Sequence, residues 1–184
     1  MNPFQYLGSE HRELTRVLCV LDRLIQAVDA GASIDRHELE IVVDYFREVG
    51  DMAHHDKEET LLVPALVRHH MDWFDGPLAE LRKDHGQERY LTRSLRHAAC
   101  KQSEWSDEDK RHFVSIGRAY SEFLRAHMGR ENEVWFVAAA HVLPESVQAD
   151  LVESFQRFDR ELAELNDFAL LRERALSLLE KYGV

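Results

Sequence analysis

The sequence predicts an all-α protein: an up-down-up-down four-helix bundle followed by one or two additional C-terminal helices. Its 184 residues include only 8 glycines and 4 prolines, so long stretches contain no helix breaker. Within these stretches, apolar residues recur at steps of three and four, which is the period of an amphipathic helix. The connections between them are short, which favours antiparallel neighbours.

The first two helices are defined by their apolar stripes. We predict the first over about residues 9–29, ended by Gly31, and the second over about residues 35–69. Pro64 lies inside the second pattern and predicts a kink or a local irregularity there. The stripe of the first helix is Leu7, Leu14, Leu18, Leu21, Ile25 and Val28; that of the second includes Leu39, Val43, Phe46, Leu61 and Ala65.

Start signals define the third and fourth helices. Asp75-Gly76-Pro77 predicts the start of a helix that runs to about residue 99, with proline near the first helical position. Ser106, followed three residues later by Asp109, resembles a capping box and predicts a helix to about residue 140. Two further helical patterns follow Pro144. We therefore predict a bundle over residues 1–142 and a helical extension over 143–184, packed on the bundle or forming a homodimer interface.

Composition excludes several classes of partner. The net charge of −11 argues against nucleic acid and anionic lipid. No apolar run approaches the roughly 18–20 residues of a membrane-spanning helix. The first residues lack the pattern of a secretory signal. Cys19 and Cys100 have no CxxC neighbour and no disulfide-framework spacing, so we expect both to be reduced thiols. These features predict a cytoplasmic protein.

One short motif occurs twice and predicts a metal site. Each copy is a histidine followed four residues later by a glutamate, a spacing that places both side chains on one helix face. Each copy has a partner histidine upstream, preceded by an acid, in Glu10-His11 and Asp84-His85. All four bundle helices thus carry a ligand-type residue within the apolar stripe. The candidate ligands are His11, His54, Glu58, His85, His127 and Glu131.

The number and type of these side chains favour two metal ions. A single histidine on a core stripe is usually a hydrogen-bonded structural residue, but six polar residues at repeating positions are not explained in that way. Imidazole and carboxylate without thiolate suit iron, manganese or zinc. Six ligands exceed the four of a structural zinc site and suit two ions bridged by Glu58 and Glu131. Ferritin-like proteins differ, since they use Glu-x-x-His.

The chain resembles the hemerythrin-like HHE cation-binding family. The matching segments are EHREL, HHDKEETLLVPAL, DHGQERYLTRSL and HMGRENEVWF, which lie within residues 10–136. The later PESVQADLVESFQRFDRE is similar to the tail of the bacterial branch. The resemblance implies a non-heme di-iron centre, with His11, His54, His85 and His127 as terminal ligands and with Glu58 and Glu131 as bridges.

The chain departs from the oxygen-carrying members at one position. These have a second histidine one turn after the third-helix histidine, where this chain has Arg89, which stays protonated and cannot be a ligand. Glu88 could fill the gap directly or through water, or could form a salt bridge to Arg89 or to a neighbouring helix. His55 and Glu59 repeat the four-residue spacing but lie about 100° around an α-helix from His54 and Glu58. We expect His54 to be the ligand of that pair, with His55 and Glu59 kept as possible ligands. Glu59 is otherwise expected to support a ligand from outside, to form an ion pair between helices or to be solvated.

Three functions fit these features. The first is a di-iron protein that binds, senses or handles dioxygen, nitric oxide, peroxide or iron itself. The second is a peroxide-degrading oxidoreductase that uses coordination positions left open where the fifth histidine is absent. The third is a helical adaptor in which the metal is structural. With two histidines for each ion, both ions should keep open positions, and reversible oxygen carriage is not expected as the main role.

Overall fold

The computed structural model describes residues 1–71, 75–165 and 167–184, and these residues form the predicted all-α bundle with extra helices. The first bundle helix is α1 (Pro3–Asp29). The second is a continuous rod made of α2 (Arg36–Tyr45), the π-helical segments η1 (Phe46–His55) and η2 (Glu58–Leu62), and α3 (Val63–Arg68). The third is α4 (Gly76–Ala99). The fourth joins α5 (Asp107–Arg130), the π-helical η3 (Glu131–Trp135) and α6 (Phe136–Val142).

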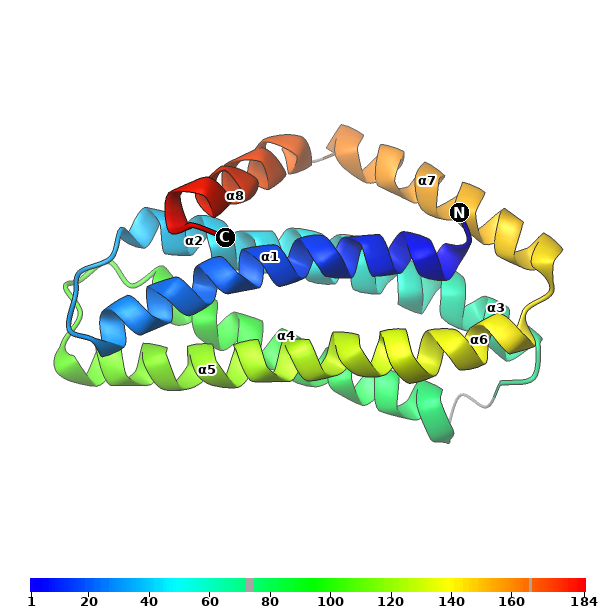
Figure 1. The fold of residues 1–184 in the computed structure, drawn as a ribbon, viewed down its shortest axis with the longest axis horizontal. Coiled ribbons are helices and arrows are strands. Elements are labelled where there is room, and N and C mark those ends of the chain that lie inside the picture. The colour runs from blue at the N-terminus through cyan, green and yellow to red at the C-terminus, as the bar shows by residue number, and fades with distance from the viewer. Residues whose placement is uncertain (72–74, 166) are drawn as a thin grey trace.

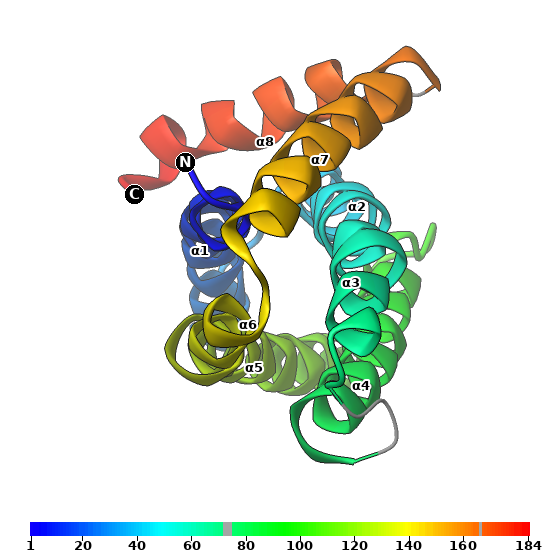
Figure 2. The ribbon, with the colours of Figure 1, turned by 90° about the vertical axis from the view of Figure 1, so that its right-hand side faces the viewer.

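The four rods surround a common centre, as the view along the bundle shows (Figure 2). Neighbours in the ring are α1 with α2, α2 with α4, α4 with α5, and α5 with α1. Two further helices, α7 (Glu145–Leu165) and α8 (Phe168–Tyr182), lie outside this ring (Figure 1). Both pack against α1, and they reach the second rod at η2 and at α2 respectively. The division into two domains stays a prediction.

Helix ends agree with the sequence except at the start of α1. Ser106 and Asp109 form the predicted capping box of α5, and α4 begins after Asp75. The predicted start of the first helix near Ser9 is wrong, because α1 begins at Pro3. Its N-cap Asn2 accepts a hydrogen bond from the Gln5 backbone, and the Gln5 side chain accepts one from the Asn2 backbone. This arrangement satisfies two amide groups that the helix cannot pair internally.

A layer of polar side chains divides the apolar core in two. One apolar cluster surrounds Leu18, Leu39 and Phe113 toward the α1–α2 turn. The other surrounds Leu7, Leu66 and Phe155 at the opposite end of the bundle. The buried histidines and glutamates lie along the chain between the members of these two clusters. Each rod therefore buries apolar residues on both sides of a polar layer. Among the described residues, no helix is both long enough and apolar enough to cross a membrane.

Candidate metal centre

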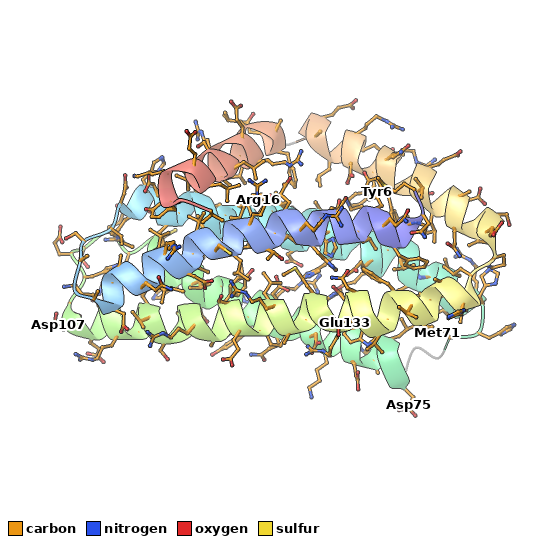
Figure 3. All side chains as sticks on the ribbon, viewed as in Figure 1. Tyr6, Arg16, Met71, Asp75, Asp107 and Glu133 are labelled. Carbon is orange, nitrogen blue, oxygen red and sulfur yellow. The ribbon has the colours of Figure 1, made fainter. Side chains whose placement is uncertain are left out.

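The polar layer contains all six predicted ligands. Side chains from the four rods fill the space between the helices (Figure 3). Each of the six predicted side chains is at most 2% exposed, and two further side chains, His55 and Glu88, are 1% exposed. The other six histidines of the chain, by contrast, are exposed or only partly buried. Burial on this scale is costly for imidazole and carboxylate groups unless they are paired or bound to a cation.

The layer is organised as two donor groups. The first donor group consists of His11, His54, Glu58 and Glu131, and the second consists of His55, His85 and His127. Within each group, one nitrogen or oxygen atom of every member lies within 4.8 Å of those of the others. Nε2 of His11 lies 2.9 Å from Nε2 of His54, so two imidazole nitrogens of the first group face the same point.

The two glutamates connect the donor groups because each directs its two oxygens to different histidines. Glu58 Oε1 is 3.7 Å from His54 Nε2 in the first group, and its Oε2 is 3.2 Å from His85 Nε2 in the second. Glu131 Oε2 is 3.0 Å from His11 Nε2, and its Oε1 is 3.2 Å from His127 Nε2. Each carboxylate thus spans the two donor groups.

His55 belongs to the second donor group, which corrects the expectation from helical phase. Its ring stacks on that of His85 with 3.9 Å between centroids, and it is buried to the same degree as His54. The expected separation of about 100° assumed an α-helix. The segment η1 is instead π-helical, with wider turns closed by i→i+5 hydrogen bonds, so both histidines point into the bundle. The sequence signal was the adjacent pair itself, His54-His55.

The Nδ1 atom of each histidine in the layer faces a polar group on the outer side. His54 Nδ1 lies 2.8 Å from Glu10 Oε2, and His11 Nδ1 lies 3.0 Å from Asn132 Oδ1. The corresponding pairs in the second group are His85 with Glu59 at 2.7 Å, His127 with Asp84 at 3.5 Å, and His55 with Asp51 at 3.5 Å. Nδ1 of His55 and of His127 make no hydrogen bond to these groups. The hydrogen-bonded outer partners of the other three histidines fix the ring orientation and leave Nε2 to a metal ion.

The family assignment rests on a comparison of the whole sequence with models of protein families. Residues 2–139 match the model described as the hemerythrin HHE cation-binding domain. The chain belongs to the hemerythrin HHE family. No curated protein and no solved structure matches it. The matched region ends within α6, so it covers the four rods and both donor groups but neither α7 nor α8.

Arg89 occupies the position at which the oxygen-carrying members have a further histidine, and it binds outer carboxylates there. Its guanidinium lies 2.6 Å from Asp51 and 3.0 Å from Glu59, the outer partners of His55 and His85. It therefore holds two carboxylates that in turn face histidines of the second donor group. Of the alternatives for Glu59, the structure shows the ion pair between helices. Burial alone would raise the pKa of its carboxyl, but His85 and Arg89 lower it to about 2.

Glu88 lies beside the second donor group and is not part of it. Its Oε2 is 3.3 Å from His55 Nε2, and its Oε1 accepts a hydrogen bond of 3.3 Å from the buried Tyr120 hydroxyl. Burial raises the pKa of Glu88 to about 7. Of the sequence alternatives, a salt bridge with Arg89 is not observed, since Glu88 points inward and Arg89 pairs with Asp51 and Glu59. The alternative of an ion pair with a neighbouring helix corresponds to the contact of Glu88 with His55 on the second rod. Glu88 can serve as a further ligand or as a partner of His55.

The electrostatics of the HHE layer fit a bound cation. None of the four oxygens of Glu58 and Glu131 makes a hydrogen bond within the described residues, and Nε2 of His85 and of His127 are also without one. Burial alone would raise the pKa of Glu131, but the imidazoles around it, first His127, hold it well below its usual value. Burial lowers the pKa of His55 far below its usual value, which keeps it in the neutral form that metal binding needs. Burial alone would also lower the pKa of His11, His85 and His127, but the carboxylates beside them raise it, so a metal ion would have to displace protons from these imidazoles. Carboxylate and imidazole donors without thiolate suit iron, manganese or zinc.

Proposed function

We propose that this HHE protein binds two iron ions in the polar layer and uses them to bind a small ligand such as dioxygen, nitric oxide or peroxide. The observation that carries the proposal is the division of the oxygens of Glu58 and Glu131 between the two donor groups. One ion would take His11 and His54, and the other would take His55, His85 and His127. Both would share the two carboxylates.

The two ions would differ in how many protein ligands they have. The first donor group offers two imidazoles, whereas the second offers three. The expectation of two histidines for each ion does not include His55. With His55 as a ligand, the second ion would have fewer open positions than the first. The ion held by His11 and His54 is the one with room for an exogenous ligand. When bound, iron would supply Lewis acidity and one-electron redox chemistry at that position.

The size of an enclosed cavity supports a small ligand. A cavity of about 20 Å³ lies beside Glu58 and is otherwise lined by apolar side chains, including Leu62, Trp135 and Ala139. This volume accommodates about one water-sized molecule. A separate groove of about 810 Å³, lined in part by Thr15, Phe136 and His11, reaches the first donor group from the surface. Apolar walls around the cavity would exclude bulk water and favour a neutral diatomic molecule over a larger polar substrate.

Nitric oxide binding to the reduced, iron(II)-loaded protein tests this proposal. We expect one nitric oxide to bind per two iron ions, detected as a new optical absorption. Ala139→Leu should fill the cavity and slow binding while leaving the iron content unchanged. Ala126→Leu makes the same change on an exposed face of α5 and should leave the rate unchanged. Failure of the loaded wild-type protein to bind nitric oxide would contradict the ligand-binding function.

The peroxide-degrading alternative is separated by admitting air to the same reduced sample. A protein that binds dioxygen reversibly should return to its reduced spectrum when dioxygen is removed. A protein that reacts with peroxide should convert to a ferric form and consume added peroxide catalytically. In both cases the protein would hold the ions through the same histidines and limit access through the apolar cavity.

A further inference from the structure

Lys57 is a buried cation next to the metal centre. It lies on the second rod between His54 and Glu58, and its side chain is only 1% exposed. A lysine is rarely buried to this extent unless opposite charges compensate it. Its Nζ contacts Glu10 of α1 and lies 2.7 Å from Asp159 Oδ1 of α7. One compensating carboxylate therefore comes from the bundle and the other from the C-terminal extension.

The same carboxylate of Glu10 serves both Lys57 and a candidate ligand. Glu10 Oε1 accepts from Lys57, while its Oε2 lies 2.8 Å from Nδ1 of His54. The second oxygen of Asp159 accepts a hydrogen bond from the hydroxyl of Tyr6, which is labelled on α1 in Figure 3. A continuous chain of charged contacts thus runs from Asp159 through Lys57 and Glu10 to His54.

Removing Asp159 would change the partners of Glu10. Lys57 would keep its positive charge in a buried position with one carboxylate in place of two. Glu10 would then compensate the lysine alone, at the expense of its interaction with His54. Because outer carboxylates orient metal-binding imidazoles, a weaker Glu10–His54 interaction should lower the affinity of the first donor group.

We propose that α7 contributes to the metal centre through Asp159. This side chain is a positioning residue that acts through Lys57 and Glu10 on His54. The helix lies outside the matched family region, so the contact joins the HHE bundle to a segment that the family model does not cover. Coupling between two sites is reciprocal, so metal bound by the first donor group should also stabilise the docking of α7. This inference rests on the proposed metal centre.

Anaerobic titration with iron(II) measures the first half of the coupling. Asp159→Asn keeps the shape of the side chain and removes its charge. It should weaken iron binding by the first donor group, which has fewer imidazoles and should be the weaker site, roughly 10-fold. This is near the lower end of the effect of direct outer partners. Glu10→Gln should weaken the same site by roughly 10–100-fold. Glu153→Gln removes the same charge from an exposed position of α7 and should leave both affinities unchanged.

Hydrogen exchange measures the effect of bound metal on the docking of α7. The first comparison, with and without iron, uses the wild-type protein and so does not depend on how the variants fold. Loading with iron(II) should slow amide exchange in α7, and this protection should be lost in Asp159→Asn. Arg172→Gln removes the contact of α8 with Glu13 but leaves every contact from Asp159 to His54 in place, so iron should still protect α7 in this variant. Suppose that the wild-type protein binds two iron ions. If Asp159→Asn then binds iron with unchanged affinity, or if iron does not protect α7 of the wild type from exchange, this inference alone is overturned. A wild-type protein that binds no iron would overturn the metal centre as well.

Discussion

At the scale of single residues, His55 makes the two donor groups unequal. It adds a third imidazole to the group of His85 and His127, whereas the group of His11 and His54 has two. His55→Ala should therefore reduce the iron content from two ions per chain toward one, because the second ion loses a direct ligand. The affinity loss should be at least as large as the roughly 10–100-fold that outer partners produce. Elemental analysis after anaerobic loading and desalting measures the content.

The matched control for His55→Ala is His112→Ala. His112 is an exposed histidine on α5, so its removal deletes an imidazole without touching the polar layer. The iron content of this variant should equal that of the wild type. Full iron content in His55→Ala would show that His55 only packs against His85, and the second ion would then have two histidines.

The residue types of the centre could be predicted from the sequence, but one orientation could not. The spacing of His54 and Glu58, repeated in His127 and Glu131, places ligand-type residues within apolar stripes. All of these proved to be buried. The position of His55 depended on the local helix geometry, which the apolar period does not reveal. The outer partner Asn132 lies on another rod than His11, so spacing does not identify it, whereas Asp51 lies four residues before His55, a spacing that the sequence does show.

At the scale of elements, the π-helical segments lie where the chain supplies its ligands. η1 ends at His55, η2 begins at Glu58, and η3 begins at Glu131. Widened turns of this kind are often found at functional sites, because they change which side chains point inward. Pro64 lies just after η2, at the start of α3, in agreement with the predicted irregularity. The sequence indicated a disturbance there without indicating its geometry.

Close packing of α1 on α5 depends on Gly117. A Cβ atom at this position would lie 2.7 Å from Ile25 Cδ1 and 2.9 Å from Ile25 Cγ1, so the buried isoleucine would have to move. Overpacking a core costs about 1–3 kcal/mol, and alanine favours the helix over glycine by about 1 kcal/mol, so Gly117→Ala should lower the free energy of unfolding by up to about 2 kcal/mol. Denaturant unfolding of the metal-free protein measures the change.

Gly129→Ala is the control on the same helix. A Cβ at Gly129 would meet no atom within 4 Å, and alanine favours the helix more than glycine by about 1 kcal/mol. This variant should therefore be as stable as the wild type or more stable. If Gly117→Ala were as stable as Gly129→Ala, α1 and α5 would not be as closely packed as described.

At the scale of the whole molecule, the polar layer costs stability when no metal is bound. It separates two apolar clusters and leaves both oxygens of Glu58 and Glu131 without hydrogen bonds. Metal that binds only the folded state stabilises it by about 2.7 kcal/mol at a hundredfold excess over the dissociation constant. For a chain of this size, chelation should lower Tm by about 5–10 °C.

Calorimetry before and after chelation measures this shift, and added iron(II) should restore the original Tm. An unchanged Tm after confirmed loss of metal would mean that the layer is stable without a cation. The bundle itself was predictable because each rod keeps its apolar period along most of its length. The packing of α7 and α8 on α1 was left open, because an apolar stripe does not specify which surface it covers.

The most direct test of the two-ion centre is the number of iron ions bound per chain. Wild-type protein loaded anaerobically with iron(II) and then freed of excess metal should contain two ions per chain by elemental analysis. Two ions are expected because Glu58 and Glu131 each direct one oxygen to the first donor group and the other oxygen to the second. A single ion per chain, or none, would contradict the assignment of these glutamates as bridging ligands.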